Sequence, residues 1–341
     1  MKKTLNGERT NKKKLIGLTM LAAATAALLG ACGNGSDSGA STSSNGKSSD
    51  TVTIGVLQPV EHGSLDAAYE GFKEGLAENG YKEGDNVTFE YSNAQNDQAQ
   101  LKSMSEKLVK DKPALLLGIG TPAAQSLLNE TTEIPMVVTA VTDPVDAKLV
   151  SSLEKPGGNV TGTTDMVSID KQIELLLSIV PEAKTIGIMY NAGEPNSKIQ
   201  ADLAEEALTK AGVKTKVLTA NSTNDVQQVT TSLAKDVDGI YIPTDNTFAS
   251  AAAVIGDVAK ELKVPIVPAS TDQVTEGGLA TIGIDYHALG KQTGEMAAKI
   301  LKGDAAPADM PIESAADLEL VVNEDMAKAL GIDPDSIKAP E

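Results

Sequence analysis

The stretch ALLLGIGTPAAQ at residues 114–125 passes from an apolar run into a sequence that is typical of a helix start. Leucine and isoleucine with little polar alternation are typical of a strand that is buried on both faces. Thr121 stands where a helix N-cap is expected, and Pro122 stands where the first helical residue is expected. The stretch therefore predicts a strand followed by a helix, which is the repeating element of a parallel α/β sheet.

The same alternation of an apolar run and a helix-length stretch continues along the chain. The further runs are VTIGVL (52–57), VTFEYS (87–92), IPMVVTAV (134–141), TIGIMY (185–190), VKTKVL (213–218), DGIYIP (238–243), VPIVPA (264–269), LATIGI (279–284) and LELVVN (318–323). Strands that alternate with helices imply right-handed crossovers and parallel sheets. About ten strands fit two lobes better than one sheet. We therefore predict an α/β fold of two doubly wound parallel-sheet lobes joined by a hinge, divided near residues 152–164.

The first 50 residues differ in composition from the rest of the chain. A lysine run at residues 12–14 precedes an apolar stretch at residues 15–30, and small residues then lead to Cys32, the only cysteine. This order is typical of a secretory signal, and the apolar stretch is shorter than the roughly 20 residues of a membrane-spanning helix. The cysteine at the end of this segment resembles the lipidation site of bacterial lipoproteins. An ordinary signal peptide and a short uncleaved anchor are the alternatives to that interpretation. Residues 33–50 carry no large apolar side chain, so we expect a flexible tether there.

Composition excludes several classes of partner and site. The formal net charge of −18 disfavours nucleic acid as a partner. The only arginine is Arg9, so the chain beyond the signal offers no guanidinium to hold a carboxylate or phosphate. With His62 and His287 as the only histidines, we expect no metal site. Motifs for acyl transfer, phosphate binding and zinc proteolysis are missing, so we expect no cofactor and no enzyme, although a triad using His62 stays open.

Ligands of open parallel sheets bind beyond the carboxyl ends of the strands, so polar residues after each predicted strand are candidates. In the first half of the chain these are Gln58, Thr121, Ala123, Ala124, Thr142 and Asp143. The N–H groups of Ala123 and Ala124 would face outward at the positive end of a helix, which makes an anion site that needs no arginine. The alternative is that Thr121 merely caps its own helix.

The second half of the chain offers a comparable set of polar residues after its strands. They are Glu194, Asn196, Ser197, Asp245, Asn246, Phe248, Ser270 and Asp285. Ser197 is also a plausible N-cap, and each of these loops has an alternative interpretation as ordinary caps and turns. If the two lobes face each other, the candidates from both halves line one cleft.

The whole pattern resembles the substrate-binding lipoproteins of bacterial ABC importers, which have the type I periplasmic-binding fold. The landmarks that carry the resemblance are the cysteine at the end of the signal and the motifs VTIGVLQ, GIGTPAAQ, VTAVTDPV, GNVTGTTD, NAGEPNS, YIPTDN and IGIDYHALG. Their order is similar to a branch of the family that includes importers for tryptophan or tyrosine. The similarity covers roughly residues 52–330.

This resemblance implies three crossings of the chain between the lobes. It predicts a lipoprotein signal peptide (1–31), a lipid-anchored tether (32–50), a first lobe (51–162 and 286–310) and a second lobe (163–285 and 311–341). Lipidation of Cys32 would fix the exported protein to the outer face of the cytoplasmic membrane.

The resemblance further implies a binding protein without enzymatic activity that delivers an amino acid to ABC permease subunits and acts as a monomer. The ligand carboxylate would bind at a helix start in the first lobe, near Thr121. An acidic side chain would take the ammonium, with Asp245 and Asp285 as the first candidates and Glu194 next. No tryptophan is present, so Phe248, Tyr190 and Tyr69 are the aromatic candidates, and a mainly aliphatic pocket is equally compatible. A sensor for another small solute such as a sugar, or an exported hydrolase, is the alternative.

Overall fold

The computed structural model describes residues 51–315 and 318–340, so Cys32, the predicted signal and the whole predicted tether lie outside the described residues. A six-stranded sheet with the order β11-β5-β4-β3-β1-β2 contains only parallel pairs. Its strands are β1 (Val52–Gln58), β2 (Val87–Asn93), β3 (Leu115–Ile119), β4 (Met136–Val141), β5 (Val160–Thr164) and β11 (Glu313–Ser314). The carboxyl ends of these strands therefore share one edge.

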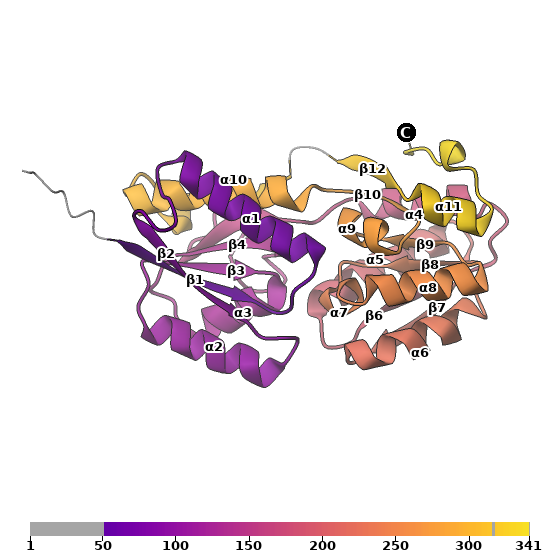
Figure 1. Cartoon of the computed structure of the whole chain (residues 1–341), viewed down its shortest axis with the longest axis horizontal. Helices are drawn as coiled ribbons and strands as arrows, with labels where there is room; N and C mark the ends of the chain where they lie inside the picture. Colours follow the sequence, from indigo (N-terminus) through magenta and orange to yellow (C-terminus); the bar gives the residue numbers. More distant parts are fainter. Residues whose placement is uncertain (1–50, 316–317, 341) are drawn as a thin grey trace, which may run out of the picture. The chain divides into compact units, whose positions relative to one another are not determined.

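Helices cover both faces of this sheet (Figure 1). They are α1 (Gly63–Glu78) and α10 (Tyr286–Lys302) on one face, and α2 (Gln98–Lys110) and α3 (Thr121–Glu130) on the other. The strand β3 shows why two layers form. Leu115 and Leu117 pack into the core under α1 and α10, whereas Leu116 packs into the core under α2 and α3. Successive side chains of a strand point to opposite faces, so an unbroken apolar run requires cover on both. We call this sheet and its four helices the first lobe.

Glycines bring α1 and α10 into unusually close contact. A Cβ atom at Gly290 would lie 1.9 Å from the carbonyl oxygen of Ala68, and one at Gly71 would lie 1.9 Å from that of His287. Gly75 and Gly294 repeat the arrangement one turn further along. These four positions let the two backbones touch, which fixes α10 on the first lobe although it comes late in the chain.

The second lobe is built on a four-stranded parallel sheet with the order β7-β6-β8-β9. Its strands are β6 (Thr185–Asn191), β7 (Lys214–Ala220), β8 (Gly239–Ile242) and β9 (Ile266–Pro268), and an antiparallel pair is formed by β10 (Ala280–Gly283) and β12 (Glu319–Val322). The helices of this lobe are α4 (Ile169–Ile179), α5 (Pro195–Lys210), α6 (Thr223–Ala234), α7 (Asn246–Ala249), α8 (Ala252–Leu262), α9 (Thr271–Glu276) and α11 (Glu324–Leu330). Short 3-10 turns occur at η1 (Pro307–Asp309) and η2 (Pro334–Ser336).

The predicted α/β class with parallel sheets is confirmed. The antiparallel pairing of β10 with β12 is the exception to parallel pairing among the described strands. The predicted lobe boundaries stay proposals, and strand pairing suggests how to refine them. A boundary at residue 162 would cut β5, and a return to the second lobe at residue 311 would precede β11, which pairs with β5. We therefore propose crossings after Thr164 and after Ser314.

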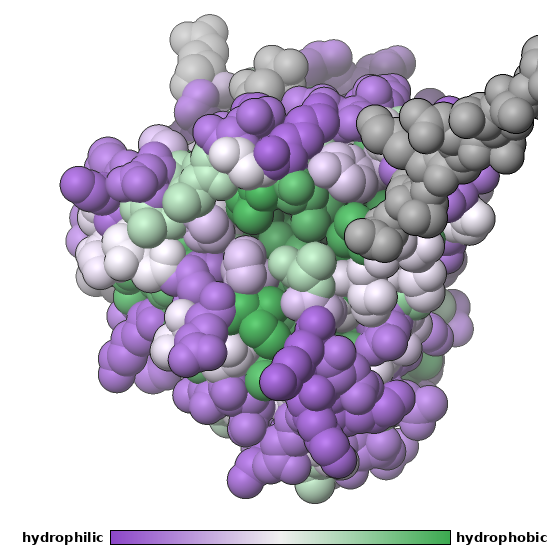
Figure 2. All heavy atoms as spheres, turned by 90° about the vertical axis from the view of Figure 1, so that its left-hand side faces the viewer, coloured by the Kyte–Doolittle hydropathy of each residue, from purple (hydrophilic) through white to green (hydrophobic). Residues whose placement is uncertain are grey.

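Figure 2 shows the face of the molecule where β1 begins, opposite the edge at which the strands of the first lobe end. Hydrophobic residues gather in the middle of this face, and hydrophilic residues surround them. Half-buried side chains such as Val52, Ile300 and Leu301 extend the core of the first lobe.

No helix within residues 51–315 and 318–340 is long and apolar enough to cross a membrane.

Candidate functional site

A small inner pocket lies where helix starts and strand ends of both lobes meet. Its cavity holds about 10 Å³, which is the space of a single water molecule. The starts of α1, α3, α5, α9 and α10, the helix α7, the end of β4 and the segments after β5 and β8 supply its walls. Its lining residues are His62, Ser64, Leu65, Thr121, Ala140, Asp165, Asn196, Thr244, Asp245, Asn246, Ala249, Ser270, Gln273 and Tyr286. Several helix N-termini directed at one pocket create a positive local potential.

Five buried polar atoms in this lining form no hydrogen bond with any described residue. They are Ser64 Oγ, Thr121 Oγ1, Asp165 Oδ1, Asn196 Oδ1 and Gln273 Nε2. A buried polar atom without a partner costs about 1–3 kcal/mol. The set contains hydrogen-bond donors and acceptors from both lobes. A small ligand that carries both kinds of group would satisfy them.

Asp165 and Tyr286 form the acidic wall of the inner pocket. Asp165 directly follows β5, and its side chain is buried, with a relative exposure of 2%. The Tyr286 hydroxyl, at the first residue of α10, donates to Asp165 Oδ2 at 2.9 Å. Burial raises the pKa of Asp165, and the Tyr286 hydroxyl, followed by the nearby Thr142 hydroxyl and the backbone N–H of Asp165 itself, offsets part of that rise. Oδ2 is thus fixed, whereas Oδ1 is buried and forms no hydrogen bond with any described residue.

The strand end beside Asp165 is irregular. The register between β4 and β5 shifts between Val138 and Val141, and Ala140 has a left-handed φ of +55°. Such a φ is unfavourable for a residue with a Cβ atom and is common at binding sites. Ala140 lines the inner pocket, so the irregular backbone directs the end of β4 into the site.

Glu194 holds the start of α7 and leaves no oxygen free for a ligand. Its Oε2 accepts from the backbone N–H and the side-chain Nδ2 of Asn246, at 3.0 and 2.6 Å. Its Oε1 accepts from the backbone N–H and the Oγ1 of Thr247, both at 3.1 Å. Four hydrogen bonds thus make Glu194 a structural group.

Asp245 is similarly occupied. Its Oδ2 accepts from the Asn191 backbone N–H at 2.6 Å, and its Oδ1 accepts from the Phe248 backbone N–H at 2.9 Å as the N-cap of α7. Burial, and then the nearby carboxylate of Glu194, raise the pKa of Asp245 to about 8. The side chain lines the inner pocket, but its oxygens already serve the backbone of the second lobe.

Two hydrogen bonds connect the lobes beside the inner pocket. His62 Nε2 lies 3.2 Å from Asn246 Oδ1, and Asn96 Nδ2 donates to Thr247 Oγ1 at 2.9 Å. Burial lowers the pKa of His62, which favours the neutral ring. Because Asn246 donates its Nδ2 to Glu194, its Oδ1 is the acceptor and the proton of neutral His62 must be on Nε2. Both hydrogen bonds between the lobes therefore end on Asn246 and Thr247, the two residues of α7 that are hydrogen-bonded to Glu194.

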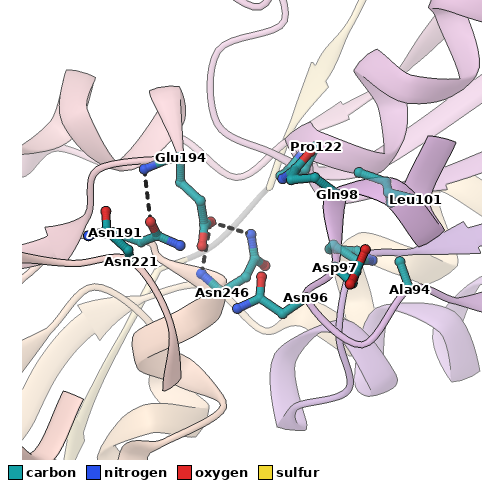
Figure 3. Close-up of a pocket in the computed structure, with 12 residues that line it drawn as sticks. Ala94, Asn96, Asp97, Gln98, Leu101, Pro122, Asn191, Glu194, Asn221 and Asn246 are labelled. Carbon is teal, nitrogen blue, oxygen red and sulfur yellow. Dashed lines mark hydrogen bonds between the residues drawn. The ribbon is translucent and has the colours of Figure 1, made fainter. Parts of the chain in front are cut away.

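A larger outer cavity of about 120 Å³ adjoins this connection and shares Asn246 with the inner pocket (Figure 3). The first lobe contributes Pro59, Ala94, Asn96, Asp97, Gln98, Leu101 and Pro122, and the second contributes Asn191, Gly193, Glu194, Asn221 and Asn246. The carbon surface of Leu101 and Pro122 faces amide groups across the cavity. This mixed lining suits a ligand with both apolar and polar parts.

The structure corrects two predictions about helix starts. Gly120, with a φ of +81°, is the N-cap of α3, so Thr121 is already helical. The Ala124 N–H donates to the Gly120 carbonyl oxygen at 3.1 Å and is not free for an anion. Glu194, and not Ser197, is the N-cap of α5. In both cases the helix begins earlier than the local sequence predicts.

Of the predicted site residues, Thr121, Asn196, Asp245, Asn246 and Ser270 line the inner pocket, and Glu194 lines the outer cavity. Ala123, Ala124, Ser197 and Thr142 are buried nearby without lining either cavity. Gln58 donates to Val60 O and Asp66 Oδ1 instead. Asp143 caps its own turn through the N–H groups of Val145 and Asp146. None of these six residues lines either cavity.

The remaining predicted residues lie away from both cavities. Phe248 is fully buried in the core of the second lobe. Tyr190 packs against that core, and Tyr69 stacks on Tyr91 at 5.2 Å between ring centroids. No aromatic candidate named from the sequence therefore lines the site.

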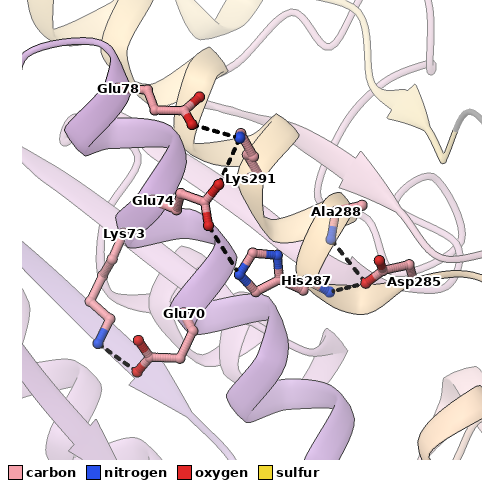
Figure 4. A network of polar contacts seen from close by, with 8 residues as sticks. All are labelled: Glu70, Lys73, Glu74, Glu78, Asp285, His287, Ala288 and Lys291. Carbon is pink, nitrogen blue, oxygen red and sulfur yellow. Dashed lines mark hydrogen bonds and ion pairs between the residues drawn. The ribbon is translucent and has the colours of Figure 1, made fainter.

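Asp285 is exposed and caps α10 through the N–H groups of His287 and Ala288 (Figure 4). It lies beside the ion pairs that link α10 to α1, in which Lys291 contacts Glu74 and Glu78, both at 2.7 Å. Asp285 therefore lies on the surface and does not line the inner pocket.

Sequence reasoning missed Asp165, Tyr286, Ser64 and Gln273, and it considered His62 as a possible member of a catalytic triad, as a polar wall of the cleft or as part of a solvated loop, but not as a named site residue. A signal for Asp165 was present, since it directly follows the run VTGTT at residues 160–164. That run was interpreted as part of the divide between lobes, so the residue after it was not considered a strand end.

Comparison with known proteins identifies the kind of molecule that this architecture resembles. The family model described as ABC transporter substrate binding protein matches residues 53–338. A tyrosine-binding protein of Clostridioides difficile (strain R20291) is 41% identical over 321 residues, covering 93% of this chain and 92% of that protein.

Two solved structures are similar over most of their length. A structure from Streptococcus pneumonia in complex with L-Trp is 41% identical with a TM-score of 0.79, covering 86% of this chain and 97% of that one. A ligand-free, open structure of a substrate-binding protein with adhesive properties from Clostridium difficile is 46% identical with a TM-score of 0.64, covering 83% and 96%. The less identical of the two chains thus has the more similar structure.

Proposed function

Because the chain belongs to the family of ABC transporter substrate-binding proteins, we propose that it captures an aromatic amino acid, tyrosine or tryptophan, for an ABC importer. The observation that carries this proposal is the inner pocket with its unpaired buried donors and acceptors. An amino acid carries an ammonium donor and a carboxylate acceptor on one carbon atom, which matches that lining. The naming of one relative for tyrosine, and the L-Trp in the structure of another, support an aromatic side chain.

The two TM-scores support a closed arrangement of the lobes in this structure. The L-Trp complex is the more similar neighbour, although the ligand-free open structure has the higher identity. The hydrogen bonds from His62 and Asn96 to α7 would hold that closed form. Because the inner pocket has room for about one water molecule, an amino acid would enter only after the lobes separate. Capture then consists of opening, binding and closure about the hinge.

The same proposal includes export and anchoring. The signal-like N-terminus and Cys32 support a protein that is lipidated and held at the outer face of the cytoplasmic membrane. As a monomer, it would present its loaded form to the permease subunits. Neither step requires a catalytic group.

Titration calorimetry of the purified protein tests the proposal. Tyrosine and tryptophan should bind, whereas leucine and myo-inositol should bind at least about tenfold more weakly. A melting curve gives a second measure, since ligand at 100 times its Kd stabilises a fold by about 2.7 kcal/mol. Preferential binding of myo-inositol or a sugar, with no binding of any aromatic amino acid, would refute the proposal.

A further inference from the structure

We infer that the Asp165 carboxylate, positioned by Tyr286, receives the ligand ammonium. This inference rests on the proposed function, because it assumes an amino-acid ligand. It differs from the expectation based on the sequence, which assigned the ammonium to Asp245, Asp285 or Glu194.

The hydrogen bonds of the other acidic groups exclude them from this role. Both oxygens of Glu194 accept two hydrogen bonds each from the start of α7. Both oxygens of Asp245 accept backbone N–H groups. Asp285 is exposed at the start of α10 and does not line the inner pocket. An ammonium bound to any of these would have to displace bonds that hold a helix start, or would bind outside the pocket.

Asp165 has the opposite combination of properties. Its side chain is 98% buried, it lines the inner pocket, and its Oδ1 has no hydrogen-bond partner among the described residues. The Tyr286 hydroxyl fixes Oδ2 at 2.9 Å, and Thr121 and Asn196 line the same pocket as Asp165. A carboxylate with one oxygen fixed and one unpaired is preorganised to accept a donor from a ligand.

The charge in the pocket points to a cationic donor. Within the described residues, neither lysine nor arginine lines the inner pocket. A buried carboxylate is unstable unless it is paired with a positive charge. The ligand ammonium would supply that charge. Thr121, at the positive end of α3, lines the same pocket and is suitably placed for the ligand carboxylate.

Proton linkage gives a consequence that a merely structural role would not have. Burial in the closed pocket raises the pKa of Asp165, and a bound ammonium would lower it. The affinity for tyrosine should therefore fall as the pH falls through the raised pKa of Asp165. His62, Asp245 and Tyr286 also face the pocket, and Asp272 on α9 acts on His62 and Tyr286. The Asp165-specific part of the pH dependence must be obtained by comparison with Asp165→Asn.

The experiment compares two ligands in matched variants. Calorimetry measures tyrosine and its deaminated analogue, 3-(4-hydroxyphenyl)propionate, which lacks only the ammonium. The parent should prefer tyrosine by about 30-fold or more, and Asp165→Asn should reduce that preference to within about threefold. Tyr286→Phe should reduce it partly, and Asp285→Asn, which alters an exposed cap, should leave it unchanged.

The outcomes separate the two hypotheses. If the parent binds no aromatic amino acid, the proposed function fails. If the parent prefers tyrosine and Asp165→Asn keeps that preference, only the Asp165 assignment is overturned. If Asp165→Asn does not fold, the parent alone decides through calorimetry in two buffers of different ionisation enthalpy. Release of a proton on binding tyrosine, but not the deaminated analogue, supports the assignment, and equal proton exchange with both ligands contradicts it.

Discussion

Replacing Gly290 by alanine tests the contact between α1 and α10 that places Tyr286 at the site. The added Cβ would lie 1.9 Å from the Ala68 carbonyl oxygen, whereas carbon and oxygen ordinarily approach to about 3.3 Å. The helices would therefore have to separate by more than about 1 Å. The first lobe would lose part of the packing of Phe72 and Leu289 on its sheet.

The magnitude follows from two opposing effects. Overpacking of a rigid core costs about 1–3 kcal/mol and occasionally more, and here the obstacle is backbone that cannot change rotamer. Alanine in place of glycine favours a helix by about 1 kcal/mol. Because this obstacle is backbone, we take the steric cost at about 3–4 kcal/mol, at and just above the top of that range, which leaves a net loss of about 2–3 kcal/mol in the free energy of unfolding. At about 2–4 °C per kcal/mol, Tm should fall by roughly 4–12 °C.

Thermal and urea unfolding of the two proteins measure this loss, with Gly158→Ala as the control. A Cβ at Gly158 meets no atom within 4 Å, so that variant should keep or slightly raise the stability. Since α10 begins at Tyr286, Gly290→Ala should also weaken tyrosine binding. A Gly290→Ala protein with a free energy of unfolding within about 0.5 kcal/mol of the parent would refute the argument.

Three further predictions follow from the site and the N-terminus. Glu194→Gln should lower stability and weaken ligand binding, because a neutral amide cannot accept all four hydrogen bonds that hold α7; unchanged melting and calorimetry would contradict this. The raised pKa of Asp245, about 8, means that the unfolded chain loses this proton more readily. The parent should therefore lose stability relative to Asp245→Asn as the pH rises from about 4 to 8, and a pH-independent difference in urea unfolding would exclude it. Cys32→Ala should release the protein from the membrane fraction, and firm retention in cell fractionation would show that another segment anchors it.

The order of strands and helices could be predicted because each depends on a short stretch of sequence. An apolar run such as residues 114–120 is too short for a typical helix and is broken by glycines, so it favours a strand covered on both faces. Helix starts were predicted less well. Whether Gly120 or Thr121 is the N-cap of α3 depends on one backbone dihedral, the left-handed φ of Gly120, which neither side chain specifies.

The residues of the site were only partly predictable. Strand ends gather at one edge of a parallel sheet, so Thr121, Asn196 and Asp245 were found by their positions alone. Tyr286 was missed because it reaches the pocket through the packing of α10 on α1, two helices that are far apart in the sequence. Phe248 was misplaced because an aromatic residue in a loop is equally compatible with a cavity and with the core.

The sequence by itself determined that acidic side chains follow the strands of this protein. Asp165, Asp245, Asp285 and Glu194 have nearly the same local setting, each beside a strand end or a helix start. Only the tertiary structure decided that Glu194 and Asp245 already accept hydrogen bonds on both oxygens and that Asp285 is exposed. Asp165, by contrast, keeps one buried oxygen without a hydrogen-bond partner. The physical reason is that a carboxylate can bind a ligand only where few N–H and O–H groups of the protein already donate hydrogen bonds to it. Those donors come from distant segments, such as Asn246 for Glu194 and Tyr286 for Asp165.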